Sequence, residues 1–160
     1  MLFRSPLSAI WSGSDENQSI AQLRALGYEH PRETLARIIA LRDSSRVRQM
    51  PQSSHTRMEQ LIPRVISAAA QQHAPDATLE RLLTLLESIS RREAYLALLN
   101  QFPQTIERGA AIAAASPWAA QYLARYPILL DELLDTRLLY APPEWPQLQA
   151  QLREIGRAHV

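Results

Sequence analysis

The placement of the prolines constrains this 160-residue chain more than any other feature of its sequence. Proline disrupts a helix interior, but it is tolerated in the first turn, where the missing N–H would have no intrahelical partner. Five of the eleven prolines stand at the head of a segment whose apolar residues recur at helical spacing: Pro31, Pro103, Pro117, Pro127 and Pro146. These prolines mark where helices begin, so the sequence predicts a series of short helices.

The spacing of apolar residues predicts helices throughout and no strands. No segment alternates apolar and polar residues, and no Asn-Gly or Asp-Gly hairpin turn occurs. Pro63 lies inside the clearest apolar stripe, in residues 54–72, and we expect it on the solvent-facing side of a kinked but continuous helix. The predicted fold is all-α, a helical bundle of about seven to nine short helices. Its expected segments are 15–26, 31–42, 54–72, Asp76 to Ile89, Ala94 to Phe102, Ile106 to Ala114, Ser116 to Tyr126, 128–134 and 146–154.

The same pattern predicts caps, pairs and a core. Asp76 and Ser116 are expected to cap their helices, and Glu87 to pair with Arg91 at i, i+4. Segment 128–134 is nearly all apolar, and we expect it to be buried on several sides. Eight side chains are predicted to be largely buried: Leu82, Leu86, Tyr95, Leu99, Trp118, Leu123, Leu130 and Leu133.

Composition excludes several classes of function. The net charge is +1, which gives no field to attract nucleic acid or acidic lipid. All 17 basic residues are arginine and there is no cysteine, so lysine and thiol chemistry are excluded. No apolar run approaches the roughly 20 residues needed to span a membrane, and the N-terminus is a poor signal peptide. We expect a cytoplasmic protein that binds neither membrane nor nucleic acid.

Histidines and carboxylates do not predict a metal or catalytic site. The four histidines stand at helix edges, without a second ligand at i+3 or i+4, and are expected at the surface: His30, His55, His73 and His159. Asp131, Glu132 and Asp135 cluster on one short segment, but a metal site would need further oxygen ligands from elsewhere. A solvated face, or pairing with Arg125 or Arg137, is the preferred interpretation.

Two further motifs have a functional and a structural interpretation. Arg42, Arg46 and Arg48 form the most basic patch, which could contact phosphate, but Asp43 dilutes it and we prefer interdomain ion pairing. Gly13-Ser14 resembles the pair that opens a nucleotidyltransferase site, yet no two acidic residues follow on a strand, so Ser14 is expected to cap a helix. The sequence therefore assigns no catalytic, cofactor-binding or metal-ligating residue.

Four strings carry a resemblance to a known family. LLESISRREAYLALL (85–99) and ASPWAAQYLARYPILLDELLD (115–135) are the longest, and ALRDSSRVRQM (40–50) and LLYAPP (138–143) fit in the same order. They resemble the bifunctional glutamine synthetase (glutamate–ammonia ligase) adenylyltransferase/adenylyl-removing enzymes of bacteria. The resemblance runs from about Ile10 to about Arg153.

The resemblance implies a parent enzyme with two nucleotidyltransferase domains. One attaches AMP from ATP to a tyrosine of glutamine synthetase, and the other removes it by phosphorolysis. Both use Mg²⁺, and PII signal proteins and glutamine set the direction. This chain is similar to the helical region between the two halves, so no catalytic residue carries over to it.

The implied organisation has three parts. Residues 1–13 end a preceding domain or linker, 14–154 form the helical linker domain, and 155–160, reading IGRAHV, depart from the family and are expected to be a non-native tail. We expect such a fragment to be inactive by itself. The alternative is a free-standing helical interaction module with no enzymatic parent.

Overall fold

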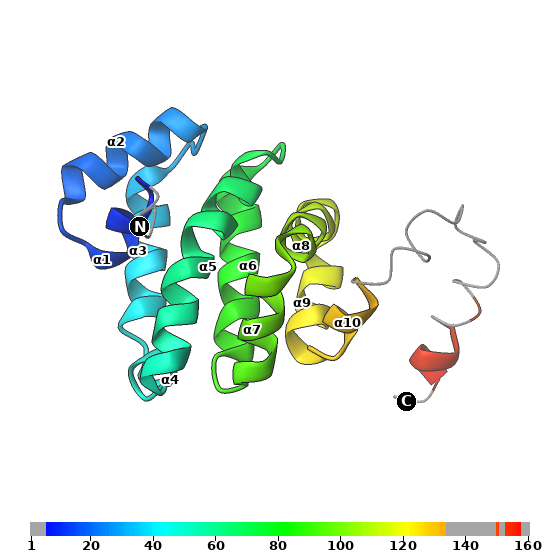
Figure 1. Cartoon of the computed structure of the whole chain (residues 1–160). Helices are drawn as coiled ribbons and strands as arrows, with labels where there is room; N and C mark the ends of the chain where they lie inside the picture. Colours follow the sequence, from blue (N-terminus) through cyan, green and yellow to red (C-terminus); the bar gives the residue numbers. More distant parts are fainter. Residues whose placement is uncertain (1–5, 134–149, 151–152, 158–160) are drawn as a thin grey trace.

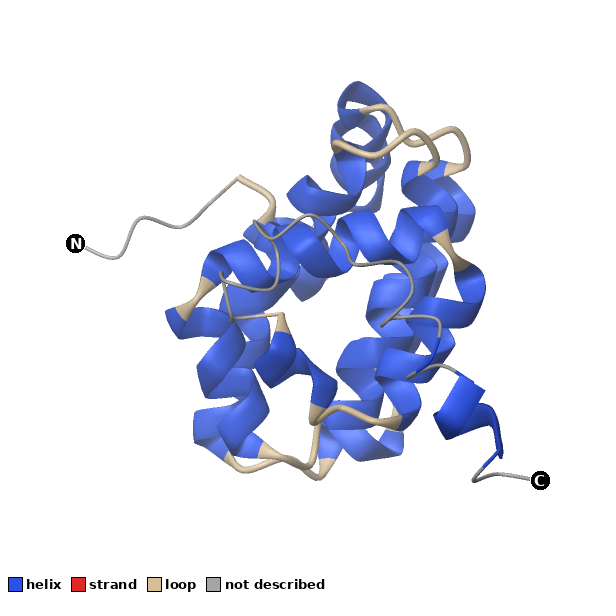
Figure 2. Cartoon of the chain, turned by 90° about the vertical axis from the view of Figure 1, so that its right-hand side faces the viewer, coloured by secondary structure: helices blue, strands red, loops and turns tan. Residues whose placement is uncertain are grey.

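The computed structural model describes residues 6–133, 150 and 153–157, and all regular structure among them is helical (Figure 2). This confirms the all-α prediction for the described part of the chain. A short helical stretch covers 153–157, and ten helices precede it, which is more than the seven to nine expected. They are α1 (Ser8–Ser12), α2 (Glu16–Leu26), α3 (Pro31–Arg42), α4 (Ser45–Arg48), α5 (Gln52–Ala70), α6 (Pro75–Ile89), α7 (Glu93–Gln101), α8 (Pro103–Ala115), α9 (Pro117–Arg125) and α10 (Leu129–Glu132).

The additional helices are short. α1 has five residues and α4 has four, so neither is long enough to display the apolar spacing that identifies longer helices. Local hydrogen bonding identifies α4 instead, because the side chain of Ser44 accepts a hydrogen bond from the Val47 N–H. Val47 is buried, which fixes this turn to the body.

Prolines begin helices as the sequence predicts. Pro31, Pro103 and Pro117 occupy the first turn of α3, α8 and α9. Pro75 does the same for α6, and Pro127 lies in the turn before α10. Pro146 lies outside the described residues.

Pro63 does not face solvent as expected. The helix α5 continues through it, but the side chain is buried. The physical reason is that α5 packs against α1, α6, α7 and α8, so neighbours surround more of its circumference than one apolar stripe would require.

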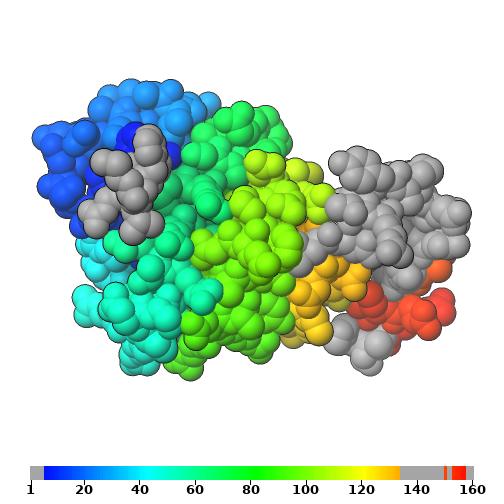
Figure 3. Space-filling model, viewed as in Figure 1, coloured from blue at the N-terminus to red at the C-terminus, as the bar shows by residue number. Residues whose placement is uncertain are grey.

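The helices form one continuous core that extends from Ile10 to Leu130. α5 and α6 lie at its centre, and α6 packs against α3, α5, α8 and α9. Figure 1 shows the helices side by side, with α1 and α2 at one end and α9 and α10 at the other; the colours of Figure 3 show the same separation. No described helix is long and apolar enough to cross a membrane.

The predicted core is largely confirmed. Leu82, Leu86, Leu99, Leu123 and Leu130 are buried. The other three predicted core residues differ: Tyr95 and Leu133 are partly buried, and Trp118 is 58% exposed.

The prediction for segment 128–134 is also wrong. Ile128 is 65% exposed, and among the described residues of this segment only Leu130 is fully buried. A short apolar run at the end of the stack has too few neighbours to bury every side.

Candidate interaction surface

Asp76 forms the strongest polar connection between α3 and α6. Its carboxylate accepts hydrogen bonds from the backbone N–H groups of Glu29 (2.8 Å) and His30 (3.1 Å) and from the Thr34 hydroxyl (2.7 Å). The prediction that Asp76 caps its own helix is wrong. Because Pro75 already starts α6, Asp76 lies in the first turn and instead satisfies free N–H groups at the start of α3.

These hydrogen bonds have an electrostatic consequence. Burial disfavours the charged carboxylate, but the hydrogen bonds from Thr34, Glu29 and His30 outweigh it and lower the pKa of Asp76. Burial of the nearby Tyr28 hydroxyl raises its pKa, and the negative charge of Asp76 raises it further. That hydroxyl therefore stays protonated and donates to the Ile66 carbonyl at 2.7 Å.

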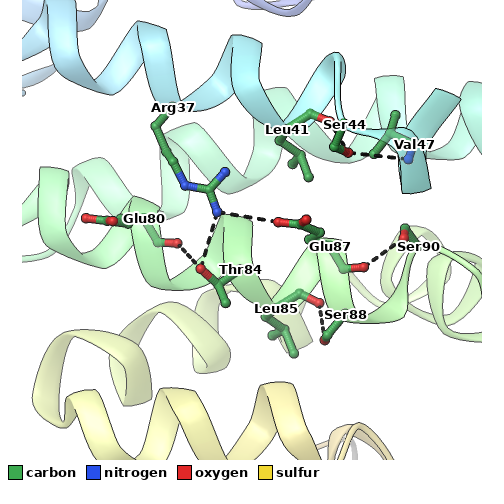
Figure 4. Close-up of polar contacts among 10 residues, drawn as sticks. All are labelled: Arg37, Leu41, Ser44, Val47, Glu80, Thr84, Leu85, Glu87, Ser88 and Ser90. Atoms are coloured by element: carbon green, nitrogen blue, oxygen red, sulfur yellow. Dashed lines mark hydrogen bonds and ion pairs between the residues drawn. The ribbon is translucent and has the colours of Figure 1, made fainter.

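A second polar connection joins the same two helices further along (Figure 4). The Arg37 guanidinium donates to the Thr84 hydroxyl at 3.3 Å and lies 3.7 Å from the Glu87 carboxylate. Among the described residues, Glu87 pairs with Arg37, and no ion pair joins it to Arg91, contrary to the prediction. α6 ends at Ile89, so Arg91 lies beyond the helix and loses the i, i+4 geometry.

Between these two connections lies a groove of about 700 Å³. Its floor is apolar, formed by Leu79 and Leu83. Its rim carries charged residues from both helices, namely Glu33, Arg37, Asp76 and Glu80, together with His30 just before α3. Asp76 and Arg37 already have partners within the fold. The polar side chains at the rim of the groove therefore connect α3 to α6.

Arginines from neighbouring helices bind the carbonyls at helix C-termini. Arg81 donates to the Ala113 carbonyl in the last turn of α8 at 2.6 Å, and Arg64 to Asn100 near the end of α7 at 3.2 Å. Arg42 donates to the Trp11 carbonyl at the end of α1 at 3.2 Å. Arg108 donates to the carbonyl of Leu133, which follows α10. These last-turn carbonyls lack intrahelical donors, and a guanidinium supplies both the donor and a favourable charge.

The Arg42 patch is thus only partly an ion-pairing surface. Arg42 pairs with its neighbour Asp43 at 3.1 Å, and this hydrogen bond lowers the pKa of Asp43. Arg46 and Arg48 are exposed on α4. The expected interdomain pairing of these arginines stays a prediction.

Gly13-Ser14 has a structural role in which Ser14 is not the cap. Asp15 caps α2 by accepting from the Gln18 N–H at 3.1 Å. Gly13 ends α1 at φ +69°, and a Cβ placed there would collide with the Arg42 guanidinium. The glycine therefore allows Arg42 to reach the end of α1. Ser116 caps α9 as predicted, accepting from the Ala119 N–H at 3.1 Å.

The histidines and carboxylates that were weighed as metal ligands in the sequence lie apart from one another where the structure describes them. His30 and His73 are exposed and His55 is half-buried, while His159 lies outside the described residues. Asp131 and Glu132 are exposed on α10, and Asp135 and Arg137 also lie outside them. In the described ranges, no three His, Asp or Glu side chains converge on a point that could hold a metal ion.

A row of aromatic side chains that the sequence did not predict follows α9 and its C-cap: Trp118, which is 58% exposed, and the half-buried Tyr122 and Tyr126. The Trp118 and Tyr122 rings stack with centroids 5.2 Å apart, and those of Tyr122 and Tyr126 are 4.8 Å apart. The opposite side of α9 buries Ala120 and Leu123. A signal was available in the sequence, because the aromatic residues recur at i, i+4 and i+8 on a different side from the buried pair.

Comparison with known proteins gives consistent matches. The family model described as glutamate-ammonia ligase adenylyltransferase matches residues 106–158. A bifunctional glutamine synthetase adenylyltransferase/adenylyl-removing enzyme of Chromobacterium violaceum is 45% identical over 147 residues, which is 92% of this chain and 16% of that protein. This chain belongs to the glutamine synthetase adenylyltransferase family, and it matches one segment of the much longer member proteins.

Two further relatives with the same description match the same share of the chain. The Aromatoleum aromaticum enzyme is 48% identical over 149 residues, covering 92% of this chain and 16% of its own length. The Pseudomonas putida enzyme is 41% identical over 148 residues, covering 92% and 15%. The chain thus spans only 15–16% of the length of these adenylyltransferases.

Proposed function

We propose that this chain is the helical segment connecting the two nucleotidyltransferase halves of a bifunctional enzyme that acts on glutamine synthetase. In this proposal one half attaches AMP from ATP and the other removes it by phosphorolysis. The parent enzyme thereby regulates nitrogen assimilation, under the control of a PII signal protein and glutamine. The relatives' description as adenylyltransferase and adenylyl-removing enzymes supports this assignment.

The observation that carries the connecting role is the placement of the first and last helices. α1 and α10 lie at opposite ends of a stack with one continuous core (Figure 1). A continuous core resists bending, because interiors are packed as densely as crystals of small molecules. Such a body would hold two flanking domains at a fixed separation.

We assign ATP and Mg²⁺ to the flanking halves. Magnesium needs several oxygen ligands that converge on one point. Among the described residues, Asp76 is engaged by three donors of this chain, and Asp131 and Glu132 are exposed on a four-residue helix. These residues do not fit a magnesium or nucleotide site, and no catalytic step is assigned to them.

The connecting role is tested in the complete enzyme by replacing residues 14–133 with a flexible Gly-Ser linker of equal length. Each half is expected to retain its own reaction, measured as attachment or release of labelled AMP. The opposed response of the two reactions to glutamine and PII is expected to weaken, because their separation is no longer fixed.

Two results would contradict the proposal. Loss of a reaction while its half remains folded, as judged by circular dichroism, would mean that the segment supplies catalytic groups. Unchanged regulation would mean that the segment does not couple the halves. A second linker with a rigid helical sequence is the matched control, because it restores stiffness without restoring this surface.

A further inference from the structure

Several arginines of this chain bind a carbonyl or a carboxylate within the fold, but a group at one end of the stack does not. Its members are exposed, and their guanidinium groups form no ion pair or hydrogen bond with the described residues. These residues, which we name the arginine cluster, are Arg46, Arg48, Arg91 and Arg92. Their charges are therefore available to a ligand.

Two neighbouring parts of the fold carry the arginine cluster. Two of its members flank the buried Val47 on α4, shortly before α5 begins. The other two form the turn between α6 and α7, and the residue after them, Glu93, pairs with Arg57 of α5 at 3.5 Å. Figure 1 shows α4 and this turn at the same end of the stack, and Figure 4 shows Val47 and Ser90 at the same end of α3 and α6. The four positive charges thus gather around the beginning of α5.

The carboxylates around the cluster are already paired. Each of the three acidic residues nearest to it in sequence has an arginine partner outside it: Asp43 with Arg42 (3.1 Å), Glu87 with Arg37 (3.7 Å) and Glu93 with Arg57 (3.5 Å). The positive charge of the cluster is therefore not neutralised by these carboxylates. Since the net charge of the whole chain is only +1, the remainder of the chain is on balance acidic. Like charges held close together repel one another, and an anionic ligand would relieve this repulsion.

The surroundings of the cluster favour carboxylates over lipid or nucleic acid. Val47 is buried, so α4 offers no exposed apolar side chain for insertion into a lipid surface. The nearby Tyr95 is half-buried and has the Arg92 guanidinium 5.8 Å from its ring centre, so it presents no free face for stacking on a base. Asp43 and Glu93 interrupt the positive surface, which disfavours a continuous phosphate backbone. Separate guanidinium groups suit separate carboxylates, which each can bind through two parallel hydrogen bonds.

We propose that the arginine cluster binds an acidic polypeptide segment of a partner protein, whose carboxylates lie across α4 and the turn between α6 and α7. This inference goes beyond the proposed function, because a connecting segment needs no ligand at this end. Exposed ion pairs are individually weak and are screened by salt. Binding is therefore expected to use several arginines at once and to depend strongly on ionic strength.

The test measures the fluorescence anisotropy of a labelled peptide of alternating Glu and Gly as the 160-residue chain is added. We expect saturable binding at low ionic strength that weakens as salt is raised, and no binding of a matched peptide of alternating Gln and Gly. Oligothymidine with the same number of negative charges, and phosphatidylserine vesicles read by co-sedimentation, represent the other two ligand classes. Failure of the Glu-containing peptide to bind, or tighter binding of the oligonucleotide or the vesicles at the same ionic strength, would overturn the proposal.

A variant pair locates the site. Arg46→Gln combined with Arg91→Gln removes one charge from each part of the cluster and is expected to weaken peptide binding several-fold. Arg24→Gln combined with Arg32→Gln removes the same charge from exposed positions of α2 and α3, and should leave the affinity nearly unchanged. Circular dichroism checks that both variants stay folded. Equal weakening by the two variants would show that the peptide responds only to net charge, and would contradict the assignment, as would unchanged binding by the first.

Discussion

At the residue scale, the chain uses arginine to complete helix ends. Arg42, Arg64, Arg81 and Arg108 each bind a carbonyl at or just after the C-terminal end of another helix. A guanidinium presents several donors in a fixed plane, which suits carbonyls that belong to a neighbouring element. Because each of these bonds joins two helices, an arginine that appears isolated in the sequence stabilises tertiary packing.

Arg81→Met tests this role. The substitution keeps much of the apolar stem and removes the donor to Ala113, leaving a part-buried carbonyl without this partner. We expect the free energy of unfolding to fall by about 1–2 kcal/mol in urea denaturation. Arg32→Met, at an exposed position of α3, should change it by less than about 0.5 kcal/mol. Equal effects of the two substitutions would contradict the capping role.

Gly13 provides a second test at this scale. Gly13→Ala is expected to destabilise the chain by about 1–2 kcal/mol because of its left-handed φ. Part of the loss should disappear in an Arg42→Met background, since the collision with the guanidinium is then removed. Gly27→Ala is also strained, at φ +106°, but has open space, so its cost should be independent of Arg42. A thermodynamic cycle without coupling between positions 13 and 42 would refute the close approach.

At the element scale, Asp76 is the group that fixes α6 against the start of α3. Its lowered pKa means that the folded state favours the carboxylate. The resulting stability is present above the unfolded pKa of about 4 and is lost as pH falls through the lower folded value. Protonation then weakens the connection between two central elements.

Asp76→Asn is therefore expected to lower the free energy of unfolding by about 1–3 kcal/mol at pH 7. The difference from the unsubstituted chain should shrink between pH 5 and about pH 3, as measured by urea denaturation across that range. Glu107→Gln, at an exposed position of α8, serves as the control for loss of one negative charge. A difference that stays constant with pH would show that the carboxylate charge is not what stabilises the junction.

Helices of nine residues or more were largely predictable from the sequence, and the reasons for the misses are specific. Apolar spacing and proline positions predict α2, α3 and α5 to α9. In contrast, α1 and α4 have only five and four residues, too few to show a repeating pattern of apolar residues. Spacing also groups residues on one face without revealing whether that face has a neighbour. The prediction that Trp118 lies in the core is wrong for this reason, because α9 buries the side that carries Leu123 and leaves Trp118 exposed.

Pairing partners across helices were not predictable from the sequence. The sequence predicts Asp76 as the cap of its own helix and Glu87 as the partner of Arg91, because capping and i, i+4 pairing are both patterns within one helix. Their observed partners lie 42 or more residues away in sequence. Without knowledge of which helices pack together, a local rule finds only the local partner.

At the scale of the whole molecule, we expect residues 155–160 to contribute little to the stability of the helical body. Residues 153–157 form a short helical stretch, and all five are exposed. Deleting residues 155–160 is expected to leave the melting temperature within about a degree or two, because exposed terminal residues contribute little packing. Calorimetry of the truncated and complete chains measures this. A fall of several degrees would mean that the tail packs against the body.

In the proposed function, this segment connects two catalytic halves and carries no catalysis itself. The most direct test incubates the purified 160-residue chain with glutamine synthetase, Mg²⁺ and ATP labelled in the AMP moiety. We expect no incorporation above a protein-free blank, while the complete enzyme under the same conditions transfers AMP. Incorporation clearly above the blank that is lost on Asp131→Asn, with folding retained, would contradict the claim and place a catalytic site in this segment.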